Sequence, residues 1–271
     1  MGQFSFQIAS LNVRGLSDRA KRLLVFDFFK KSHFDIIFLQ ETKTLFNDEN
    51  DIRNEWHNKK IIINSSKAVK NKSCGGTMVL LNCDNFVVLN SVLTSDGRCI
   101  AFDVECNGNR FHMVNTYFPN EDNDIKSFIF SMYPLVSSQY PIIWGGDFNL
   151  APNAKLDRFP TRVSNDTHIN DLFLLINTFN LVDICRKMFP NKPLFSFRRG
   201  LSKSRIDHFY VSKNLNVESY FHEDFPTSDH DIITIKVLYS STSISRGKGY
   251  WKNKTKIYES EHFWKILTIL G

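Results

Sequence analysis

Ten short apolar runs, rich in β-branched and aromatic residues, recur along the first 238 residues of the chain. They are Phe4–Val13, Asp35–Gln40, Lys60–Asn64, Thr77–Asn82, Phe86–Leu93, Cys99–Glu105, Phe111–Tyr117, Pro141–Trp144, Phe209–Val211 and Ile232–Leu238. Runs of this length, separated by polar and turn-forming residues, are typical of β-strands. Because so many strands alternate with few helices, the sequence predicts an α/β fold of two β-sheets packed face to face and flanked by helices.

Helical periodicity is clear in three segments between these runs, residues 17–31, 122–136 and 165–179. The first segment begins with Ser17 and Asp18, which are favoured helix-capping residues. Pro134 is expected to kink or end the second helix. The apolar faces expected from the spacing are Ala20, Leu23, Leu24 and Phe28 in the first segment, Ile125, Phe128, Ile129 and Met132 in the second, and Ile169, Leu172, Phe173, Ile176 and Phe179 in the third.

The character of the chain changes after Leu238. The stretch "YSSTSISRGKGYWKNKTK" is rich in Ser, Gly and Lys, which is typical of a linker. Glu259–Leu270 then regains an amphipathic helical pattern. We therefore predict one domain over residues 1–238, and over residues 239–271 a basic linker and the start of a further segment of a longer protein.

Charge and composition narrow the possible partners and compartments. The net charge of +6 favours a polyanionic partner such as nucleic acid, although a basic soluble protein without such a partner would carry the same charge. No apolar stretch approaches the roughly 20 residues that a membrane-spanning helix needs, and the first residues lack the pattern of a secretory signal. The five cysteines are scattered without zinc-ligand spacing, so we expect free thiols in a reducing, intracellular compartment.

Carboxylate and amide side chains follow the ends of predicted strands along the whole chain. In "IIWGGDFNL", Asp147 and Asn149 come where a buried strand should end, and strand alternation places them on the same side. The full set is Asn12, Gln40, Glu41, Asn115, Tyr117, Asp147, Asn149, Asp207, Ser228, Asp229 and His230. If these strand ends meet at one edge of a two-sheet sandwich, the clustered carboxylates require a cation. Since nearly all the ligands are oxygen donors, Mg²⁺ or Mn²⁺ fits better than zinc.

Each of these residues also has a purely structural interpretation. The carboxylate and amide of "GDFN" could form a turn with their own backbone, and Glu41 could be a solvated charge at a strand end. Tyr117 could be a core aromatic, Asp229 could cap a turn, and His230 could be a structural histidine. Taken together and in this order along the chain, the residues favour a catalytic site.

The order of these residues resembles the endonuclease/exonuclease/phosphatase superfamily, to which apurinic/apyrimidinic endonucleases and deoxyribonuclease I belong. "GDFN" followed by "SDH" carries the resemblance, which covers about residues 5–238. Within the superfamily, the chain is most similar to the endonuclease domain of non-LTR (LINE-type) retrotransposon polyproteins, through "LNVRGL", "FSFRRGLSKSRIDHFYVS" and the tail "GKGYWKNKT". The resemblance implies a four-layered α/β sandwich of two mixed sheets, as in deoxyribonuclease I.

The resemblance also implies hydrolysis of a DNA phosphodiester, dependent on Mg²⁺ (or Mn²⁺), that leaves a nick with a 3′-hydroxyl. The roles carried over are metal ligation for Glu41, Asn12 and Asp229, activation and positioning of the attacking water for Asp147 and Asn149, and contact with the scissile phosphate for Tyr117 and for His230, whose ring Asp207 would hold. Ser196 and Ser228 would be support or secondary phosphate positions. Tyr117 stands where deoxyribonuclease I-like members carry a second catalytic histidine, which favours the apurinic-endonuclease and LINE branch.

Two basic features are expected to approach DNA. Arg14 departs from the family pattern, because abasic-site enzymes often carry Asp at that position, so we expect one principal metal site and Arg14 near the substrate. Phe197–Arg205 reads as a basic hairpin, and the resemblance implies that it acts in target-site choice. The cations assigned to DNA phosphates or a minor groove are Arg198, Arg199, Lys203 and Arg205.

Four functions are compatible with the sequence. The first is a retrotransposon endonuclease, which would be nuclear, would bind double-stranded DNA, and would be followed in its polyprotein by a reverse transcriptase that primes on the nick. The second is an abasic-site repair endonuclease, which would need apolar residues lining an abasic pocket. The third is a phosphatase or lipid phosphodiesterase on the same fold, and the fourth is a DNA-binding module without catalysis.

Overall fold

A computed structural model describes residues 3–56, 59–65, 67–69 and 72–240 of the 271-residue chain. The helices are α1 (Arg19–Lys31), the 3-10 helix η1 (Phe46–Asp48), α2 (Glu49–Glu55), α3 (Asp122–Val136), α4 (Ile169–Thr178) and α5 (Ile184–Met188). The strands are β1 (Gln3–Asn12), β2 (Ile36–Gln40), β3 (Ile61–Asn64), β4 (Lys67–Val69), β5 (Lys72–Cys74), β6 (Thr77–Leu81), β7 (Val87–Leu93), β8 (Cys99–Cys106), β9 (Asn109–Tyr117), β10 (Ile142–Asp147), β11 (Arg158–Phe159), β12 (Leu181–Asp183), β13 (Phe197–Arg199), β14 (Ser202–Ser204), β15 (Asp207–Ser212), β16 (Asn216–Glu223) and β17 (Ile232–Ser240). The predicted amphipathic segment Glu259–Leu270 lies outside the described residues.

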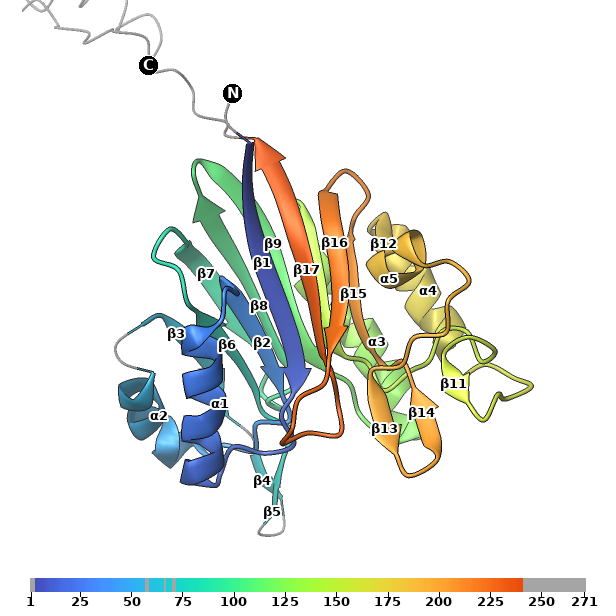
Figure 1. The fold of residues 1–271 in the computed structure, drawn as a ribbon, viewed down its shortest axis with the longest axis horizontal. Coiled ribbons are helices and arrows are strands. Elements are labelled where there is room, and N and C mark those ends of the chain that lie inside the picture. The colour runs from blue at the N-terminus through green and yellow to red at the C-terminus, as the bar shows by residue number, and fades with distance from the viewer. Residues whose placement is uncertain (1–2, 57–58, 66, 70–71, 241–271) are drawn as a thin grey trace, which may run out of the picture. The chain divides into compact units, whose positions relative to one another are not determined.

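Two six-stranded mixed sheets form the centre of the fold (Figure 1). The first has the order β16-β17-β1-β2-β6-β3, and the second has the order β12-β15-β10-β9-β8-β7. In each sheet one central pair is parallel, β1 with β2 and β9 with β10, while the strands beside them run antiparallel. The predicted α/β sandwich of two mixed sheets is confirmed.

Apolar side chains fill three layers between these elements. Phe38 of the first sheet packs with Phe102 and Phe209 of the second sheet in the central layer. Helices α3 and α4 cover the outer face of the second sheet, where Trp144 is buried. Helix α1 covers the outer face of the first sheet. With two sheets and two helical layers, the architecture has the expected four layers.

The exposed and buried faces of α1 differ from those predicted. The helix does begin after the predicted cap, because the Asp18 side chain accepts a hydrogen bond from the backbone N–H of Lys21. The buried side chains are Arg22, Val25, Phe26 and Phe29, whereas Leu23 and Leu24 are exposed, so the predicted face was wrong. The spacing of apolar residues did not predict this buried face, because the face includes a charged residue, Arg22. Arg22 Nε donates to Glu55 Oε2 at 2.6 Å, which allows the guanidinium to lie inside.

The parallel pairs explain why polar strand ends meet at one edge. β1 and β2 run in the same direction, so their carboxyl ends lie together, and β17, antiparallel to β1, begins there. In the second sheet β9 and β10 end together, and β15 begins beside them. Figure 1 shows the hairpins β4–β5 and β13–β14 at this same end of the sheets. The fold therefore gathers residues that are separated by more than 200 positions in the sequence, such as Asn12 and Asp229.

The two glycines before Asp147 are required by close packing. A Cβ atom on Gly146 would lie 2.0 Å from the backbone oxygen of Thr116 in β9, and Gly146 has a φ of +142°. We expect Gly146→Ala to destabilise the protein by about 3 kcal/mol or more, because both the backbone of β9 and the left-handed φ oppose a side chain. Gly200, in the β13–β14 turn with φ +59°, has nothing within 4 Å of an added Cβ. Gly200→Ala should therefore cost only about 1–2 kcal/mol in urea denaturation, and equal losses for the two variants would contradict this explanation.

Candidate active site

Asn12, at the carboxyl end of β1, joins two carboxylates at the edge where the strands end. Its Nδ2 donates to Asp147 Oδ2 at 2.8 Å and to Glu41 Oε2 at 3.1 Å. Its Oδ1 accepts the backbone N–H of Arg14 at 3.0 Å, which fixes the orientation of the amide. Asp147 also accepts the backbone N–H of Asn149 through Oδ1 at 2.9 Å. These contacts bring five of the predicted site residues together.

A second group holds His230 against the end of the second sheet. His230 Nδ1 lies 2.8 Å from Asp207 Oδ2, and the same oxygen accepts the hydroxyl of Ser196 at 2.7 Å. The Phe197 ring packs on the histidine, with ring centroids 4.8 Å apart. The Ser228 hydroxyl accepts the backbone N–H of His230 and donates to the carbonyl of Asn12. The two hydroxyls thus hold Asp207 and the segment that carries His230.

Burial and charge shift the acid–base properties of these groups. Burial and the neighbouring Asp207 carboxylate raise the pKa of Asp147 to about 7, against the opposing influence of His230 and the Asn12 amide. Burial alone would lower the pKa of His230, but the charge and hydrogen bond of Asp207 raise it to about 9. Near neutral pH the site therefore holds a carboxylate able to accept a proton beside a protonated histidine, a pairing suited to general acid–base chemistry.

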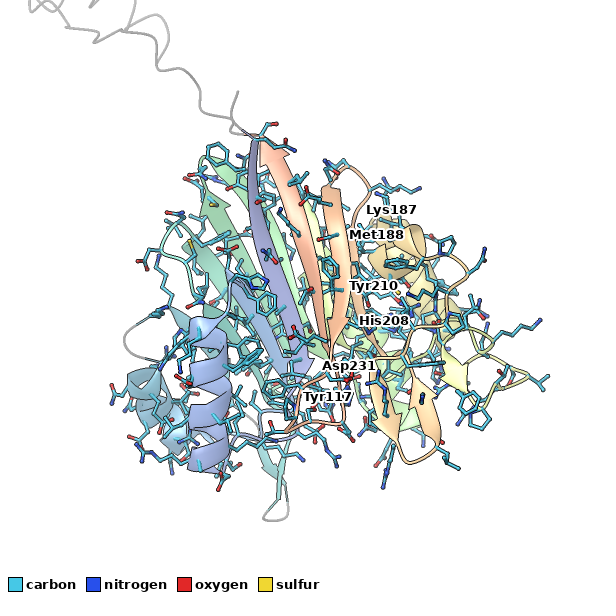
Figure 2. The ribbon with its side chains drawn as sticks, in the orientation of Figure 1. Tyr117, Lys187, Met188, His208, Tyr210 and Asp231 are labelled. Carbon is cyan, nitrogen blue, oxygen red and sulfur yellow. The ribbon has the colours of Figure 1, made fainter. Side chains whose placement is uncertain are left out.

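Tyr117 and Asn149 complete the predicted catalytic set. Tyr117 ends β9 opposite Asp147 and is only 6% exposed. Burial and the carboxylates of Glu41 and Asp147 raise the pKa of Tyr117, so its hydroxyl remains a donor. Asn149 has a left-handed φ of 52°, and its Nδ2 donates to the carbonyl of Phe118 at 2.8 Å. Figure 2 labels Tyr117 and Asp231, each at the end of the sheets where β1 stops and β17 begins.

A cavity of about 280 Å³ opens at this edge. It is lined by Asn12, Arg14, Glu41, Tyr117, Asn120, Asp147, Asn149, Phe197, Arg199, Ile206, Asp229 and His230. Four other hollows of the described surface are larger, but none of their linings includes Asp147 or His230. The chemistry of its lining residues, rather than its volume, identifies this cavity as the candidate active site.

The donor groups in this cavity and directly behind it fit a hard divalent cation. Buried oxygens of two carboxylates, Asp207 Oδ1 and Asp229 Oδ1, have no hydrogen-bond partner among the described residues. Ligand atoms of Asp147, Asp207 and His230 lie within 4.8 Å of one another. Glu41 and Asp229, two of the predicted metal ligands, line the same cavity. Oxygen donors of this kind match the preferences of magnesium and manganese.

Glu41 and Asp229, the two predicted metal ligands with carboxylate groups, each already form an ion pair within the protein. Lys43 Nζ lies 2.6 Å from Glu41 Oε1, and Arg14 Nη1 lies 2.6 Å from Asp229 Oδ2. Burial would raise the pKa of Glu41, but the hydrogen bond and charge of Lys43 and the Asn12 amide hold it below its usual range. Lys43 is not among the residues that the sequence pattern singles out. Its place two residues after Glu41 in "QETK" is the signal that points to it.

The predicted basic hairpin is present, but one of its four cations was wrongly assigned. β13 and β14 form the hairpin, with Arg198, Arg199 and Lys203 exposed. Arg205 is fully buried, and its Nε donates to Asp157 Oδ1 at 2.7 Å, while Nη2 lies 2.9 Å from Asp183 Oδ2. It cannot contact DNA, because two carboxylates inside the protein already pair with it. Both partners are distant in the sequence, and no local pattern indicates them.

The neighbouring Arg198 is partly committed within the protein. Its side chain bonds to Asp231, next to His230 in the chain, and to Asp224 at 3.0 Å. Its backbone N–H donates to the carbonyl of Asp229, and Phe197 bridges to His230. The hairpin is therefore joined to the segment that carries the histidine. Neither Phe197 nor Asp231 was identified from sequence. Each stands directly beside a predicted residue, Phe197 before Arg198 in "FRR" and Asp231 after His230 in "SDHD".

Two packed mixed sheets with acidic, amide and histidine side chains at one edge define a class of nucleases and phosphatases. The chain belongs to the endonuclease/exonuclease/phosphatase family, whose profile matches residues 9–230. It is 28% identical over 272 residues to the Transposon TX1 uncharacterized 149 kDa protein of Xenopus laevis, covering 96% of this chain and 20% of that protein. The chain thus spans about a fifth of the length of this relative.

Solved structures share the fold. The AP endonuclease LMAP from Leishmania major has a TM-score of 0.71 at 19% identity, with 87% of this chain and 88% of that chain covered. The endonuclease domain of TRAS1, a telomere-specific non-LTR retrotransposon, has a TM-score of 0.60 at 12% identity, with 86% and 98% covered. None of the helices in the described part of the chain has the length and apolar character needed to cross a membrane.

Proposed function

We propose that this chain is the endonuclease domain of a non-LTR, LINE-type retrotransposon polyprotein, and that it nicks double-stranded DNA to leave a 3′-hydroxyl for reverse transcription. The observation that carries the proposal is the convergence of Asn12, Glu41, Tyr117, Asp147 and His230 on one cavity. The alignment of nearly the whole chain with part of a transposon protein supports it. The proposal places residues 1–238 in the endonuclease, a reverse transcriptase beyond residue 271, and the polyprotein in the nucleus.

The geometry suggests how the chain's own residues act on a phosphodiester. Asp147 would accept the proton of the attacking water, since its pKa lies near neutrality and Asn149 and Asn12 fix its two oxygens. Protonated His230, held by Asp207, would donate to a non-bridging oxygen of the phosphate as negative charge develops. The Tyr117 hydroxyl would donate to the same group. A magnesium ion held by Glu41 and Asp229 would stabilise the charge of the phosphate and of the departing oxygen.

Supercoiled-plasmid nicking tests this function. The purified chain should convert supercoiled DNA to the open circular form in the presence of Mg²⁺, and EDTA should stop the reaction. The His230→Ala protein, prepared in the same way, serves as the control for contaminating nucleases. Nicking that persists in EDTA or in the His230→Ala protein would contradict the assignment of the site.

An abasic-site repair endonuclease is the second candidate function. Phe197 and Ile206 form an apolar wall in the same cavity, which is a feature that a pocket for an abasic deoxyribose needs. Duplex oligonucleotides with and without one abasic site distinguish the two functions. Comparable or faster cutting of undamaged DNA supports the retrotransposon assignment, whereas cutting confined to the abasic site supports repair.

The exposed cations of the hairpin give a separate prediction. We expect the double variant Arg199→Ala, Lys203→Ala to bind undamaged duplex DNA more weakly, with the slope of log affinity against log salt reduced by about 2, because two phosphate contacts are lost. Fluorescence anisotropy over a range of salt concentrations measures this slope. The control is Lys187→Ala, Lys192→Ala, which removes equal charge from the region of α5. Equal slopes for the two double variants would remove the hairpin from the DNA interface.

A further inference from the structure

Two cations are built into the loops that carry the predicted metal ligands. Lys43 follows Glu41 by two residues and pairs with it, and Arg14 follows Asn12 by two residues and pairs with Asp229 across the edge of the first sheet. Lys43 is 37% exposed and Arg14 is 54% exposed, whereas their carboxylate partners are 17% and 19% exposed. The cations are therefore more exposed to solvent than the carboxylates with which they pair.

The backbone holds these side chains in place at a cost in free energy. Arg14, Glu41 and Lys43 all have left-handed φ angles, of 51°, 53° and 51°. Non-glycine residues rarely adopt this region and persist there only where the surroundings fix them. Here the backbone N–H of Gly15 donates to the carbonyl of Glu41 at 2.7 Å, and the two loops are joined along their length. The placement of the two cations is thus specified by the fold.

A third cation fixes the Arg14 loop from the other side. Lys21 Nζ donates to the carbonyl of Val13 at 2.6 Å. Burial and the charge of Arg14 lower the pKa of Lys21. The carboxylates of Glu41 and Asp229 stabilise these positive charges as long as they remain paired with Lys43 and Arg14. The clustered positive charges repel one another once those carboxylates bind another cation, unless an anion approaches.

Metal binding at these carboxylates would compete with the two ion pairs. Glu41 Oε1 pairs with Lys43 and Oε2 accepts a hydrogen bond from Asn12, so a divalent ion bound to Glu41 would compete with the Lys43 ammonium for the charge of this carboxylate. Lys43 is the donor with a flexible stem and access to solvent, and Arg14 is its counterpart on Asp229. Once displaced, both cations remain at the mouth of the cavity, where a DNA phosphate would meet them.

We propose that Lys43 and Arg14 are exchangeable counter-ions: each neutralises a metal-binding carboxylate in the free protein, and each turns to a DNA phosphate when a divalent cation takes its place. The proposal rests on the proposed function, since it takes DNA as the anionic partner. Its consequence is reciprocal coupling, in which the divalent cation strengthens DNA binding and DNA strengthens cation binding. Removing the lysine charge should tighten cation binding to the free protein and weaken the coupling.

Direct metal binding tests the first part of the proposal, that a divalent cation competes with Lys43 and Arg14 for the carboxylates. Binding of Mn²⁺ to the DNA-free protein is followed by the electron paramagnetic resonance signal of free Mn²⁺. We expect Lys43→Gln and Arg14→Gln each to bind Mn²⁺ about fivefold more tightly than the wild type, the scale of losing one partly exposed ion pair. Lys43→Arg keeps the charge and should bind Mn²⁺ as the wild type does. The matched control is Lys236→Gln, which removes an ion pair of the same 2.6 Å length, with Glu218, far along the chain from the site.

DNA binding tests the second part of the proposal, that Lys43 and Arg14 contact a DNA phosphate once the divalent cation is bound. Anisotropy of a long labelled duplex is measured in Mn²⁺ and in EDTA, since a single nick leaves such a duplex paired. The wild type and Lys236→Gln should gain affinity with Mn²⁺, and Lys43→Gln and Arg14→Gln should lose most of that gain. Thermal unfolding midpoints confirm that each variant is folded.

Each outcome bears on the proposal. Unchanged Mn²⁺ affinity in both charge-removing variants, or absence of Mn²⁺ binding by the wild type, would overturn the exchange. Full coupling in the variants would overturn the phosphate contact. If plasmid nicking occurs while these effects are absent, the exchange fails and the proposed function stands. If tighter Mn²⁺ binding and loss of coupling both appear but no DNA is nicked, the exchange holds and the proposed function fails.

Discussion

Asp147→Asn is expected to lose nearly all DNA nicking while the protein remains folded. The carboxylate is the group in the cavity whose pKa, about 7, suits proton acceptance near neutral pH, and an amide cannot take that proton. Loss of a general base reduces rates by about 10²–10⁴-fold. Rates of supercoiled-plasmid nicking in Mg²⁺ measure the loss.

The stability of this variant provides an independent check. A carboxyl whose pKa is raised on folding binds protons more tightly in the folded protein, so its ionised form opposes folding once the pH exceeds its unfolded pKa. Above pH 7, Asp147→Asn should therefore unfold at a temperature equal to or higher than the wild type. Asp124→Asn, on the exposed face of α3, is the control and should leave both nicking and stability unchanged. Near wild-type nicking by Asp147→Asn would refute its role as the base.

Arg205→Ala is expected to be the most destabilising single change of a charged residue. It would leave Asp157, itself fully buried, without the guanidinium that bonds to both of its oxygens at 2.7 and 3.1 Å. Burial would raise the pKa of Asp157, but Arg205 and Arg186 hold it below its usual range. Breaking a buried ion pair by removing one partner costs about 3–5 kcal/mol.

Urea denaturation at neutral pH measures this free energy of unfolding. Arg199→Ala, an exposed arginine of the same hairpin region, should change it by less than about 0.5 kcal/mol. If Arg205→Ala were as stable as Arg199→Ala and instead bound DNA more weakly, Arg205 would belong to the DNA interface after all. A large loss of stability confirms a structural role.

The strand pattern predicted the sheets and, through them, the position of the site. Polar residues at the ends of predicted strands made Asn12, Glu41 and Asp147 candidates, and the resemblance of their order along the chain to the family assigned them to a site. Strands with weaker apolar character, such as β16 and the two-residue β11, were missed. Helix α3 also continues through Pro134 to Val136, because a proline near the end of a helix disrupts only the last turn.

Errors arose where a residue's partner lies far along the chain. Arg205 reads as one cation of an exposed basic loop, and only the fold reveals that Asp157 and Asp183 enclose it. The buried face of α1 was misread for the same reason, since Glu55 neutralises Arg22. Lys43 was also missed, although its place two residues after Glu41 in "QETK" could have indicated the ion pair that the structure shows. Long-range charge pairing is therefore the feature of this fold that local sequence patterns do not reveal.

The most direct test of a priming endonuclease is to extend its nicks with a DNA polymerase. Undamaged supercoiled plasmid is treated with the chain in Mg²⁺, repurified, and incubated with labelled nucleotides and a polymerase that lacks nuclease activity. If the nicks carry 3′-hydroxyls, label enters the open circular product directly, and primer extension maps the cut positions. Label that enters only after phosphatase treatment, or plasmid that stays supercoiled, would contradict the proposal.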